Sequence, residues 1–202
     1  MVGSGAHRAD SEDLLPTPDA PLRGMDDLLA LFHEAEKPPE QWRVGTEAER
    51  IAVRATDGAL LPYDGRVSVV AIFDRLVREH GWEPKRERPD GPIIALRRGD
   101  GSVTLEPGSQ IELSGAPFRS VYDGRAESDA HWADLAPVIE ELGLVWLALG
   151  SHPFGTVEDL GWVPKMRYGV MKDYMPTRGT MAGDMMTKTC TVQANLDYAS
   201  EE

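Results

Sequence analysis

The segment at positions 103–115, VTLEPGSQIELSG, constrains the fold of this 202-residue chain more than any other. It predicts two extended stretches joined by a tight turn at Pro107-Gly108. Glu106 and Glu112 are six residues apart, so an extended chain places them on one sheet face, and the turn lets both carboxylates converge. Two acids on half-buried strands are costly unless a positive charge lies between them, and Mg²⁺ is the obvious hard cation. A solvated outer face is the commoner origin of such a pair.

A second pair of glutamates lies on the strand predicted at 43–54. The alternation of this strand puts Glu47 and Glu49 on the face that continues as Ile51 and Val53. Neighbouring like charges on one strand face repel each other, so they indicate either exposure to solvent or a shared cation. On this strand alone, the solvated face is the favoured interpretation.

Composition narrows the classes of function. The net charge is −13, which makes nucleic acid an unexpected partner and means that a phosphate-bearing substrate needs local cations or a metal. The single cysteine, Cys190, excludes an intrachain disulfide and suits a reducing, cytoplasmic location. The longest apolar run, at 144–149, is too short to cross a bilayer, and residues 1–24 lack the apolar block of a signal peptide. We therefore expect no membrane association.

The remaining pattern predicts one domain behind a mobile leader at 1–22. Helical spacing is found at four places and strand patterns at three more. His131 lies off the apolar stripe of its helix and is predicted to be on the surface. Pro137 is expected either to kink that helix or to mark its real start. The expected helices cover 25–36, 66–80, 119–142 and 166–174, and the further strands cover 92–96 with 102–105 as a hairpin, 144–149 and 187–197.

Two of these elements carry polar groups suited to a site. Arg167 lies beside an aromatic residue and a glycine, so it could hold a phosphate or carboxylate, although a surface charge covering apolar side chains explains it slightly better. The strand at 187–197 presents Gln193 and Asn195 with three other polar residues on one face, and its apolar face requires a core. Solvent-exposed strands usually carry Lys and Glu instead, so this polar face is typical of the floor beneath a polar substrate.

Taken together, six segments resemble one family, the plant-type glutamate–cysteine ligases, which are also found in bacteria. The order and spacing agree from about position 42 to 202. The segments are VGTEAE at 44–49, LEPGSQIELSGAP at 105–117, PKMRY at 164–168, YMP at 174–176, DMM at 184–186 and TCTVQANLD at 189–197.

This resemblance implies an α+β fold with a curved, mainly antiparallel sheet flanked by helices, glutamine-synthetase-like and incomplete in this chain. It also implies an ATP-dependent ligase that joins the side-chain carboxylate of L-glutamate to the amine of L-cysteine through γ-glutamyl phosphate, the first step of glutathione biosynthesis. The matching positions would bind Mg²⁺ through Glu47, Glu49, Glu106 and Glu112. Arg167 matches a catalytic cation near the phosphates of ATP, and Gln193 and Asn195 match the polar strand that faces the nucleotide.

The chain also departs from the family pattern. Arg125 occupies the position that matches a regulatory cysteine of the plant enzymes, so with Cys190 alone an intramolecular thiol switch is not expected. Family members are about twice as long, which predicts that residues 23–202 form the N-terminal portion of a single catalytic domain. Two alternatives stay open: a γ-glutamyl ligase for another amine, or an inactive nucleotide- and metal-binding fragment that needs a partner half. The sequence leaves the oligomeric state open.

Overall fold

The computed structural model describes residue 21 and residues 24–200, so the leader predicted at 1–22 lies outside the described residues apart from Pro21. The chain divides into two compact units. One contains the described residues up to Trp42 together with those from Leu196 onward, and the other is Arg43–Asn195. All the predicted site residues belong to the larger unit.

The smaller unit is built around helix α1, Met25–Ala35, which is followed by the short 3₁₀ helix η1, Pro39–Gln41. Lys37 forms an ion pair with Asp197 at 2.5 Å, and the Tyr198 hydroxyl donates to the Phe32 carbonyl oxygen at 2.6 Å. No residue of α1 is buried. The helix therefore forms where its apolar spacing predicts it, although its apolar side chains are not buried by the residues that the structure describes.

The larger unit is organised on a seven-stranded sheet, which confirms the predicted α+β class. Six strands follow the order β2-β3-β4-β5-β1-β6 with antiparallel pairing between neighbours, and β7 pairs with β1. The strands are β1 Val44–Arg54, β2 Glu83–Arg86, β3 Ile93–Arg98, β4 Gly101–Leu105, β5 Ile111–Ser114, β6 Leu144–Leu147 and β7 Val192–Leu196.

The register of this sheet brings the glutamates of β1 and β5 together. Glu49 is directly opposite Glu112, and Glu47 is opposite Ser114. Thr104 of β4 is also opposite Glu112, so Glu106, two residues further along, continues the same face. The two predicted pairs, Glu106 with Glu112 and Glu47 with Glu49, therefore share one face of the sheet.

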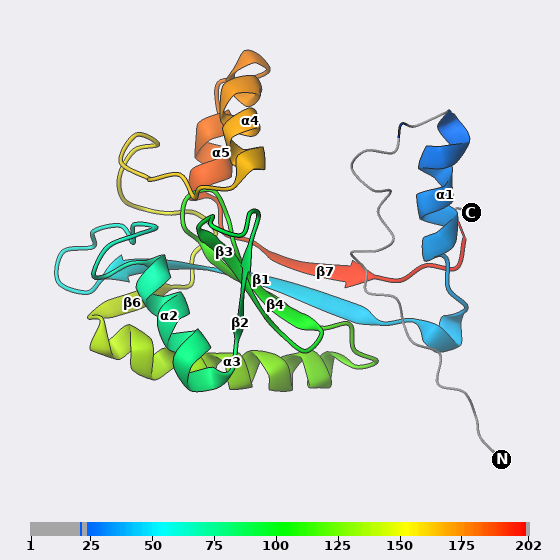
Figure 1. Cartoon of the computed structure of the whole chain (residues 1–202), viewed down its shortest axis with the longest axis horizontal. Helices are drawn as coiled ribbons and strands as arrows, with labels where there is room; N and C mark the ends of the chain where they lie inside the picture. The colour runs from blue at the N-terminus through cyan, green and yellow to red at the C-terminus, as the bar shows by residue number, and fades with distance from the viewer. Residues whose placement is uncertain (1–20, 22–23, 201–202) are drawn as a thin grey trace. The chain divides into compact units, whose positions relative to one another are not determined.

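The other sheet face is covered by helices α2, Val69–His80, and α3, Val121–Glu141 (Figure 1). Ser68 caps α2 by accepting from the Ala71 amide, and Gly81 ends it in the left-handed conformation at φ 70°, as its position predicts. None of the described helices is long and apolar enough to cross a membrane. The buried core between these helices and the sheet includes Ile72, Phe73, Leu76, Leu96, Val103, Leu105, Ile111, Leu113, Leu135 and Val138.

The strand predicted at 187–197 is wrong in its first half. Residues Ala182–Lys188 form helix α5, which follows α4, Met166–Tyr174, and the 3₁₀ helix η2, Met175–Thr177. Thr187 is fully buried, and its hydroxyl donates to the Gly183 carbonyl oxygen one helical turn earlier. This residue is therefore part of α5 and not of a strand. The expected core behind β7 is also wrong, because Val192 is 76% exposed.

The prediction for His131 is also wrong, because this residue is buried with 7% of its surface exposed. It lies on the face of α3 that continues as Leu135, Val138 and Ile139, at spacings of four, seven and eight residues. Its ring packs edge-on against Trp82 with 5.6 Å between the ring centroids. The helix thus turns a histidine toward the sheet and leaves Trp132 half exposed.

Candidate functional site

The open face of the sheet carries a pocket of about 470 Å³. Its walls come from β1, β3, β4, β5 and β7, from the residues that follow β2 and β4, and from the residue before α4 together with the start of that helix. All the predicted site residues except Asn195 line it. The lining residues are Glu47, Glu49, Glu87, Ile94, Ala95, Thr104, Glu106, Glu112, Ser114, Lys165, Arg167 and Gln193.

Glu47 is held by the two predicted carboxamides. Gln193 Nε2 donates to Glu47 Oε2 at 2.9 Å, and Asn195 Nδ2 donates to Glu47 Oε1 at 3.0 Å. Alternate residues of β7 therefore fix both carboxylate oxygens. Asn195 acts on the pocket through Glu47, whereas Gln193 also lines the pocket itself.

Glu49 is more deeply placed, with 8% of its surface exposed. Its carboxylate accepts from the Thr191 amide at 3.0 Å and from Thr191 Oγ1 at 2.8 Å. Burial, followed by the charges of Glu112 and Glu47, raises the pKa of Glu49, and the Thr191 hydrogen bonds offset part of that rise. A cation in the pocket would relieve the same repulsion.

Glu112 is buried and is oriented by two hydroxyl groups. Thr104 Oγ1 donates to Glu112 Oε1 at 2.8 Å, and Ser114 Oγ donates to the same oxygen. Sequence reasoning missed these two hydroxyls, whereas Thr191 belongs to the polar strand face that it predicted. Strand alternation could have found Thr104 and Ser114, because each is two residues from a predicted glutamate.

The basic side of the pocket is built on α4 and contains a residue that sequence reasoning did not single out. Lys165 is buried, and its Nζ donates to the Leu105 carbonyl oxygen at 2.6 Å. Burial, followed by the charge of Arg167, lowers the pKa of Lys165 to about 8. The sequence gives no sign that Lys165, just before a helix, is buried, because its burial depends on a contact with β4.

Tyr168 connects the cations to Glu106. Its hydroxyl donates to the Leu105 carbonyl oxygen at 2.6 Å and accepts from an Arg167 guanidinium nitrogen at 3.2 Å. Burial raises the pKa of Tyr168 to about 12, so the phenol stays protonated. Burial, and then the charge of Glu112, raises the pKa of Glu106, while Lys165 lowers it. The cations of Lys165 and Arg167 and the carboxylate of Glu106 thus meet at the end of β4.

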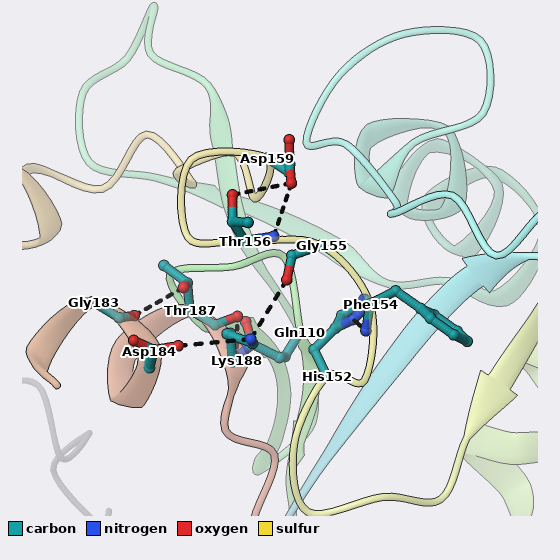
Figure 2. A network of polar contacts seen from close by, with 10 residues as sticks. All are labelled: Gln110, His152, Phe154, Gly155, Thr156, Asp159, Gly183, Asp184, Thr187 and Lys188. Carbon is teal, nitrogen blue, oxygen red and sulfur yellow. Dashed lines mark hydrogen bonds and ion pairs between the residues drawn. The ribbon is translucent and has the colours of Figure 1, made fainter.

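The turn that carries Glu106 is locked to the segment before β7. Gln110 Nε2 donates to the Thr189 carbonyl oxygen at 2.7 Å and to that of Thr187 at 3.3 Å. Figure 2 shows Gln110 beside Thr187 and Lys188. Lys188 forms an ion pair with Asp184 and donates a hydrogen bond to the Gly155 carbonyl oxygen. Glu106 and the Thr191 that fixes Glu49 therefore lie on segments joined by one buried carboxamide.

Close packing at this turn leads to a first prediction. A Cβ atom at Gly108 would lie 2.1 Å from the Thr187 carbonyl oxygen, far inside contact distance. We expect Gly108→Ala to lower the free energy of unfolding by about 2 kcal/mol, because backbone must move apart. Denaturant unfolding measures this loss, and Gly169→Ala, at a helical site with open space around it, is the control. An equal effect of the two substitutions would contradict the packing argument.

The donor set suits a hard cation held together with other oxygen ligands. Carboxylate oxygens are the ligands that Mg²⁺ prefers, and protein sites usually supply one or two of them beside waters and substrate phosphates. Within 24–200, no three His, Cys, Asp or Glu side chains converge closely enough to hold a metal ion by themselves. The residues therefore fit Mg²⁺ bound jointly with phosphate, and they do not form a closed protein cage.

Comparison with known proteins identifies the family. Residues 43–202 match the model of glutamate-cysteine ligase family 2 (GCS2). The chain belongs to this family. It is 38% identical over 176 residues to a chloroplastic glutamate–cysteine ligase of Brassica juncea, an alignment that covers 87% of this chain and 33% of the relative.

Two further relatives show the same partial coverage. The chain is 37% identical over 177 residues to glutamate–cysteine ligase B of Oryza sativa subsp. japonica, which covers 88% of this chain and 35% of that protein. It is 37% identical over 206 residues to the chloroplastic enzyme of Medicago truncatula, which covers 100% of this chain and 39% of that protein. The chain thus spans between a third and two fifths of the length of these family members.

Proposed function

We propose that this protein contributes the metal- and phosphate-binding face of an ATP-dependent ligase that joins L-glutamate to L-cysteine. One observation carries the proposal: four carboxylates of the sheet line the same pocket as Lys165 and Arg167. Family membership supports the reaction, because the relatives named above are glutamate–cysteine ligases.

The proposed reaction has two transfers. The side-chain carboxylate of glutamate attacks the γ-phosphorus of ATP, which releases ADP and forms an acyl phosphate. The cysteine amine then attacks the acyl carbon, the C–O bond to phosphate breaks, and the amine loses a proton. Such chemistry depends mainly on positioning and on electrostatic stabilisation of the phosphoryl oxygens.

The residues divide this work by charge. Arg167 is placed to stabilise negative charge on a phosphoryl group, since its guanidinium is oriented by Tyr168 and remains charged. Glu47, Glu49, Glu106 and Glu112 would hold Mg²⁺, and Gln193 and Asn195 keep Glu47 oriented. When bound, Mg²⁺ supplies neutralisation of phosphate charge. For the location we keep the reducing cytoplasm suggested by the lone Cys190.

The test is glutamate- and cysteine-dependent release of phosphate by the purified 202-residue chain with MgATP. We expect release to need both amino acids, and we expect calorimetry to show MgATP binding that is lost without Mg²⁺. Other amines in place of cysteine test the acceptor. Binding without turnover would reduce the proposal to a nucleotide-binding module, and absence of binding would overturn it.

A further inference from the structure

Helix α4 carries a cation of the pocket, but the helix itself contributes little to holding its first turn in place. It is nine residues long, which is too short for a stable isolated helix in water, and Tyr168 is its buried residue. Its N-cap residue, Lys165, directs its ammonium group to the Leu105 carbonyl oxygen and cannot accept a hydrogen bond. The unpaired amides of the first turn therefore need an acceptor from elsewhere in the chain.

That acceptor comes from the loop between β2 and β3. The Glu87 carboxylate accepts a hydrogen bond from the Met166 amide, with 2.9 Å to Oε2 and 3.2 Å to Oε1. Arg88, the next residue of the loop, donates from a guanidinium nitrogen to the Met166 sulfur at 3.2 Å. A carboxylate at this position also interacts favourably with the positive end of the helix dipole. The loop thus caps a helix that begins 79 residues further along the chain.

The loop is itself fixed on the sheet. β2 pairs with β3, and the register of this pair shifts between Lys85 and Arg86, directly before Glu87. A shift of this kind changes the direction of the side chains that follow it. The Gly91 amide donates to the Arg88 carbonyl oxygen at 2.9 Å and closes the turn. Glu87 therefore reaches α4 from a hydrogen-bonded support.

A carboxylate at this place is otherwise unexpected in a phosphate-binding pocket. The side chain of Glu87 belongs to the pocket lining together with Lys165 and Arg167. A negative charge there repels phosphate, so Glu87 opposes phosphate binding if it acts by its charge alone. Its hydrogen bond to α4 gives it a different effect, because Arg167 directly follows the capped amide of Met166.

We propose that Glu87 is a positioning residue for the cations that bind phosphate. By capping α4, its carboxylate holds Lys165 and Arg167 at the pocket before a phosphate group binds, which lowers the cost of ordering them on binding. Glu87 acts through the helix, and its own oxygens contact the Met166 amide. This inference rests on the proposed function, because it gives Glu87 a role in the binding of MgATP.

The test is calorimetric titration of the full chain and three variants with MgATP. Glu87→Ala removes the cap, and we expect it to weaken binding about fivefold, the effect typical of losing one helix cap. Glu87→Gln keeps an acceptor oxygen, so it should bind within about twofold of the unmodified chain. Asp90→Ala is the matched control, because it removes the same charge from an exposed position of the same loop. We expect this control to bind at least as tightly as the unmodified chain.

The variants separate the cap from other effects of the charge. Binding by Glu87→Ala that equals or exceeds that of the unmodified chain overturns this inference alone, since removing a repulsive charge gives that result. An equal loss in Glu87→Ala and Glu87→Gln also overturns it, because the charge of a metal ligand would then explain the loss. If the unmodified chain binds no MgATP, the proposed function fails and this inference fails with it.

A second measurement needs no ligand. Solvent exchange of the Met166 amide hydrogen, followed by NMR on the ¹⁵N-labelled full chain, reports directly on the cap. We expect exchange to be faster in Glu87→Ala than in Glu87→Gln, and Asp90→Ala to exchange like the unmodified chain. Equal exchange rates in the two Glu87 variants would refute the proposed cap.

Discussion

Replacing Glu106 by glutamine is expected to lower glutamate- and cysteine-dependent phosphate release by about 100- to 1,000-fold, the loss typical of removing one preorganised electrostatic group. Glutamine keeps the shape of the side chain but removes the charge that would hold a cation beside phosphate. Glu106 lines the same pocket as Glu112, Glu49, Lys165 and Arg167, and the charges of all four act on its carboxylate. It is thus the carboxylate at the boundary between the acidic and basic parts of the pocket.

The same substitution should leave the fold intact or strengthen it. Burial and the neighbouring carboxylates raise the pKa of Glu106, which means that its charge is costly in the folded chain. A neutral side chain removes that cost, so the free energy of unfolding is expected to stay the same or rise. Glu83→Gln, at an exposed position on β2, is the control for both measurements. Phosphate release that is unchanged in the Glu106 variant would exclude Glu106 from the mechanism.

Strand periodicity explains why much of the candidate site could be predicted from the sequence. Side chains alternate between faces with a period of two, so alternation alone places Glu47 with Glu49 on one face of β1. The register of β1 with β5 then puts Glu112 on that face. The hairpin register then needs only the turn after Glu106. This local rule made the sheet face predictable, and the family resemblance indicated which face carried the site.

The wrong or missing predictions concern residues whose burial depends on tertiary contacts. Thr189 and Thr191 continue the alternation of β7, but the preceding residues bury Thr187 in a helix, and the strand pattern gives no sign of that boundary. Lys165 was not selected because its burial depends on contacts with β4, 60 residues away. Arg50 was not selected for a related reason: it lies between Ala48 and Ala52 on its face of β1, and only the packing of α3 shows that a cavity lies beside it.

The burial of His131 predicts a loss of stability in acid. Burial lowers the pKa of His131 from 6.5 to about 4, with Asp134 opposing this shift and Arg98 and Arg50 adding to it. Between these two values the unfolded chain binds a proton that the folded chain does not. The contribution of the neutral His131 imidazole to the free energy of unfolding is therefore complete above pH 6.5 and is lost as the pH falls to about 4. The expected loss is about 3 kcal/mol, from 1.36 kcal/mol for each pH unit.

Denaturant unfolding of the wild-type chain and of His131→Phe between pH 7 and 4 isolates this contribution, because the acidic groups that titrate over the same range are common to both. Phenylalanine keeps a ring against Trp82 but binds no proton, so the difference in unfolding free energy should shift in favour of the variant as the pH falls. His33→Phe, at an exposed position of α1, controls for the loss of a histidine. A difference between wild type and His131→Phe that stays constant with pH would show that the imidazole is solvated in the folded chain. Such a result would contradict the burial of His131 against Trp82.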